Sequence, residues 1–342
     1  MLSAVLGLFS QDLAIDLGTS TTRIYQRGQG VVCAEPTLLA IHTDTHGRRR
    51  VLAVGDEARP MIGRTPGDIR AVAPVRAGQI EDYEVAEALL LHLMRRIHGR
   101  AGLISPRLVM TVPFTATEME RRAARVCCES AGARNVHLVE RPLAAALGAE
   151  LPVHEPSGHM VVDLGGGSTE ISILSLSGVV SCVVVPGGGD GMDDSIAAWL
   201  RDRHQLFVGR ATATRLKHEL GSVASRAHRE TSRVSGRCLR EGIPRTVEVR
   251  AEEVHQALAP GLEAISRGIR HSLEHAPPEL GTDVLDHGLV LTGGGSRLDG
   301  IESALRDSTG LPVICAENAE RACVLGAGKV LEELDLLRIV AS

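Results

Sequence analysis

The chain has 342 residues, 37 Lys and Arg against 42 Asp and Glu, a net charge of −5, and 44% hydrophobic residues. This length allows two domains with substantial cores. The negative charge provides no general attraction to nucleic acid, and 2% aromatic residues argue against base-stacking surfaces, so we expect no nucleic-acid partner. The seven cysteines form no Cys-x-x-Cys pair, which argues against a zinc framework and fits buried thiols in a reducing cytosol.

The N-terminal segment is strongly apolar. Its large side chains are Leu2, Val5, Leu6, Leu8 and Phe9. Their spacing fits a short amphipathic turn that seeks a membrane surface, and it fits equally a hydrophobic terminus packed onto its own domain.

The first half of the chain alternates strand and helix patterns. We expect three short strands over 12–42, an insert after Pro36, a helix over 86–98, a buried strand over 107–112, a helix that begins at Thr115 or Thr117, a strand over 136–139 and a small-residue helix over 142–150. Proline and glycine at 152–158 then mark a boundary between two halves.

The second half follows a similar order. We expect a polar, helical insert over about 190–240, a strand over 289–291 that runs into a Gly-rich turn, a helix over 298–307 and a final helix over 321–337.

An internal repeat is the most informative feature of the chain. Asp16-Leu17-Gly18 and Asp163-Leu164-Gly165 each end an apolar run and precede a turn rich in Gly, Ser and Thr, and both copies continue to Gly-Val-Val. A repeat of this length predicts two similarly folded halves.

Each copy of the repeat also predicts phosphate chemistry. Glycine lets backbone amides approach phosphate oxygens closely, and the neighbouring hydroxyls of Thr19, Ser20, Thr21, Ser168 and Thr169 add donors. The two carboxylates, Asp16 and Asp163, would hold Mg²⁺ through water, because this ion keeps much of its hydration. A single copy would favour an ordinary glycine turn, whereas two copies half a chain apart favour a phosphate site.

A third glycine-rich turn, Gly293–Ser296, follows a strand and precedes a helix, an order that suits the ribose or α-phosphate of a nucleotide. It is neither a P-loop, because no Gly-Lys-Ser/Thr follows, nor a dinucleotide fingerprint.

Short motifs along nearly the whole chain resemble the bacterial actin-like MreB/Mbl family of the actin/hexokinase/Hsp70 superfamily, with the chain as a divergent paralogue. The matching segments are 14–19, 53–55, 62–67, 120–123, 160–163, 277–280 and 291–295.

The resemblance implies an α/β fold of the actin-like (ribonuclease H-like) type. Two lobes would each contain a mixed-sheet domain with a smaller inserted subdomain, and the nucleotide would bind in the cleft between the lobes. The implied boundaries are 1–150 for the first lobe with an insert at about 34–72, 151–320 for the second with an insert at about 188–244, and 321–342 for a C-terminal helix that returns to the first lobe.

The resemblance also implies a function. The chain would bind ATP and Mg²⁺, polymerise with itself, and form filaments that lie peripherally on the inner face of the cytoplasmic membrane. There it would organise cell-wall elongation, and so cell shape, with partners such as RodZ and MreC. The apolar terminus and a second apolar pair, Leu103 and Ile104, would contact the membrane.

The turns and the resemblance together nominate one set of nucleotide-binding residues. They are Asp16, Gly18, Thr19, Ser20, Thr21, Asp163, Gly165, Gly166, Gly167, Ser168, Thr214, Lys217, Gly293, Gly294, Gly295 and Ser296.

Two positions depart from the family pattern. The family has a catalytic Glu immediately before the proline that opens the first connecting helix, whereas this chain has Arg141 before Pro142, with Glu140 one residue earlier. Adjacent residues project differently, and an arginine cannot act as a base, although it can bind a γ-phosphate. Thr214 also replaces a family Glu, while Lys217 persists. The family implies an ATPase, and we expect ATP binding with slow or absent hydrolysis.

Two alternatives remain open from the sequence. A small-molecule kinase of the same superfamily would need a phosphoacceptor pocket with a general base. A nucleotide-gated binding protein that does not polymerise would differ only at the surfaces between subunits.

Overall fold

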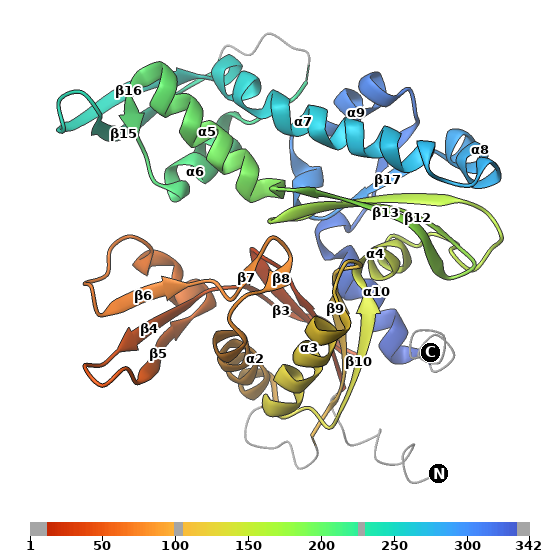
Figure 1. The fold of residues 1–342 in the computed structure, drawn as a ribbon. Coiled ribbons are helices and arrows are strands. Elements are labelled where there is room, and N and C mark those ends of the chain that lie inside the picture. Colours follow the sequence, from red (N-terminus) through yellow and green to blue (C-terminus); the bar gives the residue numbers. More distant parts are fainter. Residues whose placement is uncertain (1–11, 99–104, 225–229, 334–342) are drawn as a thin grey trace. The chain divides into compact units, whose positions relative to one another are not determined.

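The computed structural model describes residues 12–98, 105–224 and 230–333 (Figure 1). The chain divides into two compact units, which we call unit 1 (Met1–Glu155 with Arg321–Ser342) and unit 2 (Pro156–Glu320). Each unit contains its own five-stranded mixed sheet and a hydrophobic core, with two smaller sheets in unit 1 and one in unit 2.

The main sheet of unit 1 has the strand order β10-β9-β1-β2-β3. Its strands are β1 (Leu13–Leu17), β2 (Thr21–Gln26), β3 (Gly30–Pro36), β9 (Arg107–Val112) and β10 (Asn135–Glu140). The first three strands pair antiparallel, and β1, β9 and β10 pair parallel.

The smaller strands of unit 1 lie between β3 and α2 in the sequence. They are β4 (Leu39–Thr43), β5 (Arg49–Val54) and β6 (Ile69–Val72), followed by the hairpin of β7 (Val75–Arg76) and β8 (Gln79–Ile80). The prediction of three strands over 12–42 is therefore wrong by one. Pro36 ends β3, and the chain then enters a different sheet through β4.

Helices cover both faces of the unit 1 sheet. They are α2 (Tyr83–His98), α3 (Glu118–Ser130), α4 (Arg141–Gly148) and α10 (Ala322–Glu332). Leu13, Ile15 and Leu17 share a core with α2 and α3. Because side chains alternate along a strand, Ala14 and Asp16 point to the opposite face, against which α10 packs.

The start of α3 is defined by a capping box. Thr117 accepts a hydrogen bond from the Glu120 amide, and the Glu120 side chain accepts one from the Thr117 amide. This pairing satisfies two amides that the helix itself leaves unpaired, so Thr117 rather than Thr115 begins the helix.

The main sheet of unit 2 repeats the topology of unit 1. Its order is β13-β12-β11-β17-β18, formed by β11 (His159–Leu164), β12 (Ser168–Ser175), β13 (Gly178–Pro186), β17 (Leu289–Thr292) and β18 (Val313–Cys315). Its first three strands pair antiparallel and the rest pair parallel, as in unit 1. The duplication predicted from the repeated motif is therefore confirmed.

The remaining elements of unit 2 form its helices and smaller sheet. They are α5 (Gly188–His204), β14 (Leu206–Phe207), α6 (Arg210–Leu220), β15 (Thr231–Cys238), β16 (Pro244–Arg250), α7 (Ala251–Glu274), α8 (Pro278–His287) and α9 (Ile301–Thr309). The long helix α7 packs against β12 and β13 (Figure 1). The prediction of a helical insert up to 240 is wrong over β15, where only Val234 and Cys238 are buried and the strand alternation is too weak to recognise.

Helices α4 and α10 of unit 1 cross with their backbones in direct contact. A Cβ atom on Gly148 would overlap the Ala322 carbonyl, and one on Gly326 would overlap the Ala144 carbonyl. Backbone atoms cannot move aside as a flexible side chain can, so both positions require glycine.

We expect Gly326→Ala to lower the free energy of unfolding by about 2 kcal/mol or more, because the added methyl group must separate the two helices. The matched control is Gly261→Ala in α7, where an added Cβ meets no atom within 4 Å and alanine favours the helix by about 0.5–1 kcal/mol. Urea unfolding followed by circular dichroism measures both. Equal free energies of unfolding for the two variants would contradict the close backbone contact between α4 and α10 at Gly326.

Candidate nucleotide-binding site

The first Asp-Leu-Gly turn joins β1 to β2 in unit 1. Asp16 is 7% exposed and accepts a hydrogen bond of 2.7 Å from Thr111 Oγ1. The Gly18 amide donates to the Thr21 carbonyl at 3.3 Å, and a Cβ on Gly18 would lie 2.8 Å from that oxygen. The turn therefore requires glycine and places a buried carboxylate beside the exposed Ser20.

The second Asp-Leu-Gly turn, between β11 and β12 of unit 2, has the same construction. Asp163 is 5% exposed and accepts a hydrogen bond of 3.1 Å from Thr292 Oγ1. The Gly165 amide donates to the Ser168 carbonyl at 3.0 Å, and a Cβ on Gly165 would lie 2.8 Å from that oxygen. The two copies thus match in conformation as well as in sequence, since in each unit the glycine lies close to the carbonyl oxygen of the residue three positions later.

The third glycine-rich turn packs directly on the second. Gly293 has a φ of +79°, and a Cβ there would lie 2.7 Å from Asp163 Oδ1. A Cβ on Gly295 would lie 2.8 Å from the Leu164 Cβ, whereas one on Gly294 would meet no atom within 4 Å. Ser296 donates its hydroxyl to the Gly293 carbonyl at 2.7 Å. Two of the three glycines are therefore needed for packing, whereas the space beside Gly294 is open.

The junction of β10 and α4 separates the two candidate catalytic side chains. Glu140 is the N-cap residue of α4 and accepts an ion-pair hydrogen bond of 2.9 Å from Arg121 on α3. Arg141 is 7% exposed, and its Nε lies 3.9 Å from Asp16 Oδ1. The two adjacent side chains thus have different partners: Glu140 pairs with Arg121 on α3, and Arg141 pairs with Asp16 in the first turn.

The two carboxylates differ in how they suit a magnesium ion. Mg²⁺ binds oxygen ligands and is commonly held by one or two carboxylates together with water and phosphate oxygens. Asp163 and Asp16 each have a threonine hydroxyl beside them and offer the oxygen ligands that this role needs. Asp16 already has a guanidinium beside it, so part of its charge is neutralised within unit 1.

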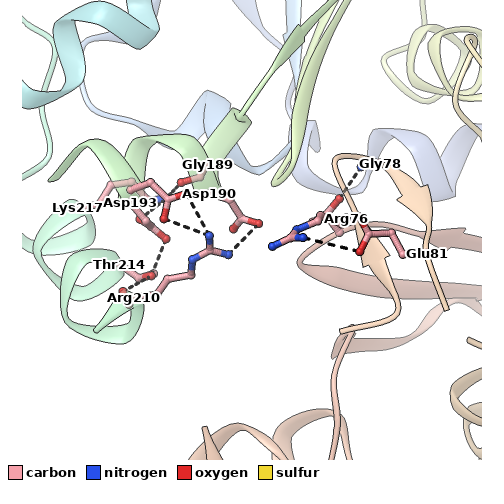
Figure 2. A network of polar contacts seen from close by, with 11 residues as sticks. Arg76, Gly78, Glu81, Gly189, Asp190, Asp193, Arg210, Thr214 and Lys217 are labelled. Atoms are coloured by element: carbon pink, nitrogen blue, oxygen red, sulfur yellow. Dashed lines mark hydrogen bonds and ion pairs between the residues drawn. The ribbon is translucent and has the colours of Figure 1, made fainter. Parts of the chain in front are cut away.

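Helix α6 in unit 2 holds the two residues that the family resemblance assigned to the nucleotide, and both contact the start of α5 (Figure 2). Thr214 donates its hydroxyl to Asp193 Oδ2 at 2.6 Å. The Lys217 ammonium lies 2.7 Å from Asp193 Oδ1 and donates to the Gly189 carbonyl at 2.6 Å. Since Asp193 is only 3% exposed, these contacts compensate a buried charge and fasten α6 to α5.

A second acid on α5 lies in the same network. Burial raises the pKa of the Asp190 carboxyl, and Arg210, whose Nη1 lies 3.4 Å away, opposes that rise. Arg210 also forms a hydrogen bond of 3.1 Å with Asp194 (Figure 2 shows the Arg210 contacts). Sequence analysis missed Asp190, Asp193 and Arg210; the only available signal was the recurrence of acids three and four residues apart on one helix face.

Several predicted membrane residues lie outside the described part of the chain. They are Leu2, Val5, Leu6, Leu8, Phe9, Leu103 and Ile104. Among the residues that the structure does describe, no helix combines the length and apolar character that crossing a bilayer requires.

Comparisons with known proteins agree with the fold. The family model for MreB/Mbl protein matches residues 10–339. Cell shape-determining protein MreB of Escherichia coli (strain K12) is 44% identical over 338 residues, which cover 98% of this chain and 97% of that protein.

Solved structures show the same similarity. MreB5 of Spiroplasma citri bound to ADP superimposes with a TM-score of 0.89 at 31% identity, covering 96% of this chain and 97% of that one. Its AMPPNP-bound form gives a TM-score of 0.87 at 30% identity, with the same coverage. The MamK double helical filament, at 23% identity, a TM-score of 0.77 and coverage of 94% and 99%, shows the shared fold. The actin-like α/β fold is thereby confirmed, and this chain belongs to the MreB/Mbl family.

Proposed function

We propose that this chain is an ATP-binding, actin-like filament protein that helps to determine cell shape. The observation that carries the proposal is the identical construction of the two turns, each with a buried carboxylate and a glycine whose amide closes the turn. Such turns suit phosphate oxygens and a hydrated Mg²⁺. The nucleotides bound to MreB5 and the name of the Escherichia coli relative support the same function.

The finer parts of the proposal rest on the family resemblance. The protein polymerises with itself, through a head-to-tail contact between identical subunits that does not close and so generates a filament. The filaments lie in the cytoplasm on the inner membrane surface, where the apolar N-terminal segment and Leu103 with Ile104 contact lipid. There they organise cell-wall elongation together with proteins such as RodZ and MreC.

The side chains beside the first turn favour slow hydrolysis. A water molecule that attacks the γ-phosphate is normally oriented by a residue that can accept its proton. Arg141 remains protonated and has no acceptor atom, and Glu140 is engaged by Arg121. Binding of ATP and its cleavage are therefore separable in this protein, and the bound state persists.

Sedimentation and flotation test the filament proposal. We expect the full-length protein to pellet with Mg²⁺-ATP and to float with anionic liposomes. Asp163→Asn should pellet less, because the altered turn holds the nucleotide less tightly. Protein that binds ATP yet stays monomeric at every concentration would contradict polymerisation, and protein that pellets without floating would contradict membrane binding.

Steady-state phosphate release tests the role of Arg141. We expect Arg141→Glu to hydrolyse Mg²⁺-ATP about tenfold or more faster than the unchanged protein, because the new carboxylate can orient the attacking water. Arg122→Glu makes the same change of charge on the exposed face of α3 and should leave the rate unaltered. Equal rates for the unchanged protein and Arg141→Glu would refute slow hydrolysis.

A further inference from the structure

The first inference concerns the ion pair between Arg141 and Asp16 and rests on the proposed ATP binding. Both side chains are largely buried, with Arg141 Nε 3.9 Å from Asp16 Oδ1. A buried carboxylate needs a compensating charge, and a buried guanidinium needs one equally. The two groups therefore stabilise each other within unit 1.

The packing of α4 keeps Arg141 in this position. Arg141 is the first residue of α4, Pro142 follows it, and the helix is fixed to α10 by the direct contacts at Gly148 and Gly326. A helix packed backbone to backbone cannot slide away from its neighbour without losing that contact. The packing of α4 therefore holds the Arg141 backbone close to the first turn, where its guanidinium reaches Asp16.

A guanidinium, like a metal ion, can stabilise the negative charge of a phosphate group. It keeps its charge at all physiological pH values and presents planar, paired donors that match phosphate oxygens. We propose that Arg141 is a built-in counter-cation, so that this protein binds nucleoside triphosphate without requiring Mg²⁺. Arg141 also lowers the affinity of Asp16 for a divalent cation, because it already neutralises the carboxylate.

Equilibrium binding of a fluorescent ATP analogue, with excess EDTA or with Mg²⁺, tests this proposal. For the unchanged protein we expect the two dissociation constants to agree within about threefold. Arg141→Glu and the neutral Arg141→Gln should each bind about tenfold or more weakly in EDTA than in Mg²⁺. Arg141→Lys, which keeps the charge, should regain part of the binding in EDTA, and Arg122→Glu should behave as the unchanged protein does.

The outcomes distinguish this inference from the proposed function. Absence of binding in both buffers would refute nucleotide binding itself. Binding by the unchanged protein that needs Mg²⁺ as strongly as Arg141→Gln does would overturn the counter-cation. Thermal unfolding followed by circular dichroism identifies any variant that has lost its fold. If one of Arg141→Glu and Arg141→Gln is unfolded, the other one tests whether Arg141 replaces Mg²⁺.

A second, independent inference concerns the C-terminal end of α7 in unit 2. His271, Glu274 and His275 are exposed there, and one donor atom from each lies within 4.8 Å of the others. The spacing of three and four residues places all three side chains on one face of the helix. The ring centroids of the two histidines are 4.1 Å apart.

One histidine of this group is oriented by the backbone. His275 Nδ1 lies 2.9 Å from the His271 carbonyl oxygen. A carbonyl oxygen only accepts, so Nδ1 is the donor and Nε2 is the nitrogen left for a metal ion. Metal-binding histidines are typically oriented by such a hydrogen bond from the other ring nitrogen. The negative end of the helix dipole also favours a cation at this place.

The geometry points to a binding site for a transition-metal ion of the Zn²⁺ class at His271, Glu274 and His275. Imidazole ligands suit zinc, nickel and copper, whereas Mg²⁺ prefers oxygen ligands alone. Three protein ligands leave one position of a tetrahedral zinc ion for water or for a group from another molecule.

Isothermal titration of tag-free, metal-stripped protein with Zn²⁺ and with Mg²⁺ tests the site. We expect one Zn²⁺ equivalent whose affinity falls about tenfold or more in His275→Ala and in His271→Ala, with no equivalent heat from Mg²⁺. His218→Ala removes an exposed histidine from α6 and should change nothing. Zinc affinity that is unaltered in both His271→Ala and His275→Ala would overturn the assignment.

Discussion

The backbone contact between α4 and α10 is the constraint on which the site in unit 1 depends. Gly148 and Gly326 let the two helices approach until each glycine meets a carbonyl of the other helix. Arg141, the first residue of α4, follows directly on Glu140 at the end of β10. The packing of α4 on α10 holds its backbone, and the ion pair with Asp16 holds its side chain.

The two units share a turn but differ in the side chains beside it. In both, a buried aspartate lies two residues before a glycine, at a position where a Cβ atom would come too close to a backbone carbonyl oxygen. Unit 2 places a threonine hydroxyl next to Asp163, while unit 1 places both a threonine hydroxyl and a guanidinium next to Asp16. Backbone duplication thus preserves the turn itself, while the side chains around it differ between the two units.

The contacts between α5 and α6 show that two residues assigned to a nucleotide by family resemblance also have partners within the protein. Thr214 and Lys217 were assigned to a nucleotide, and both make short contacts with the buried Asp193 instead of pointing away from the protein. These contacts secure α6, so any contact with a nucleotide must be made by side chains that already have a structural role. Asp193 could not be identified from the sequence, because its partners lie 21 and 24 residues further along on a different helix.

The sequence by itself determined the duplication and the glycine turns, and it limited the start of α3 to Thr115 or Thr117. Each of these is a local pattern, set by strand period, backbone freedom or a capping pair. Only the tertiary structure decided that Arg141 faces Asp16, that Glu140 faces Arg121, and that β15 is a strand. The reason is physical: Asp16 and Arg141 are 125 positions apart, and their distance is set by the packing of α4 on α10 and on the sheet, which no local periodicity records.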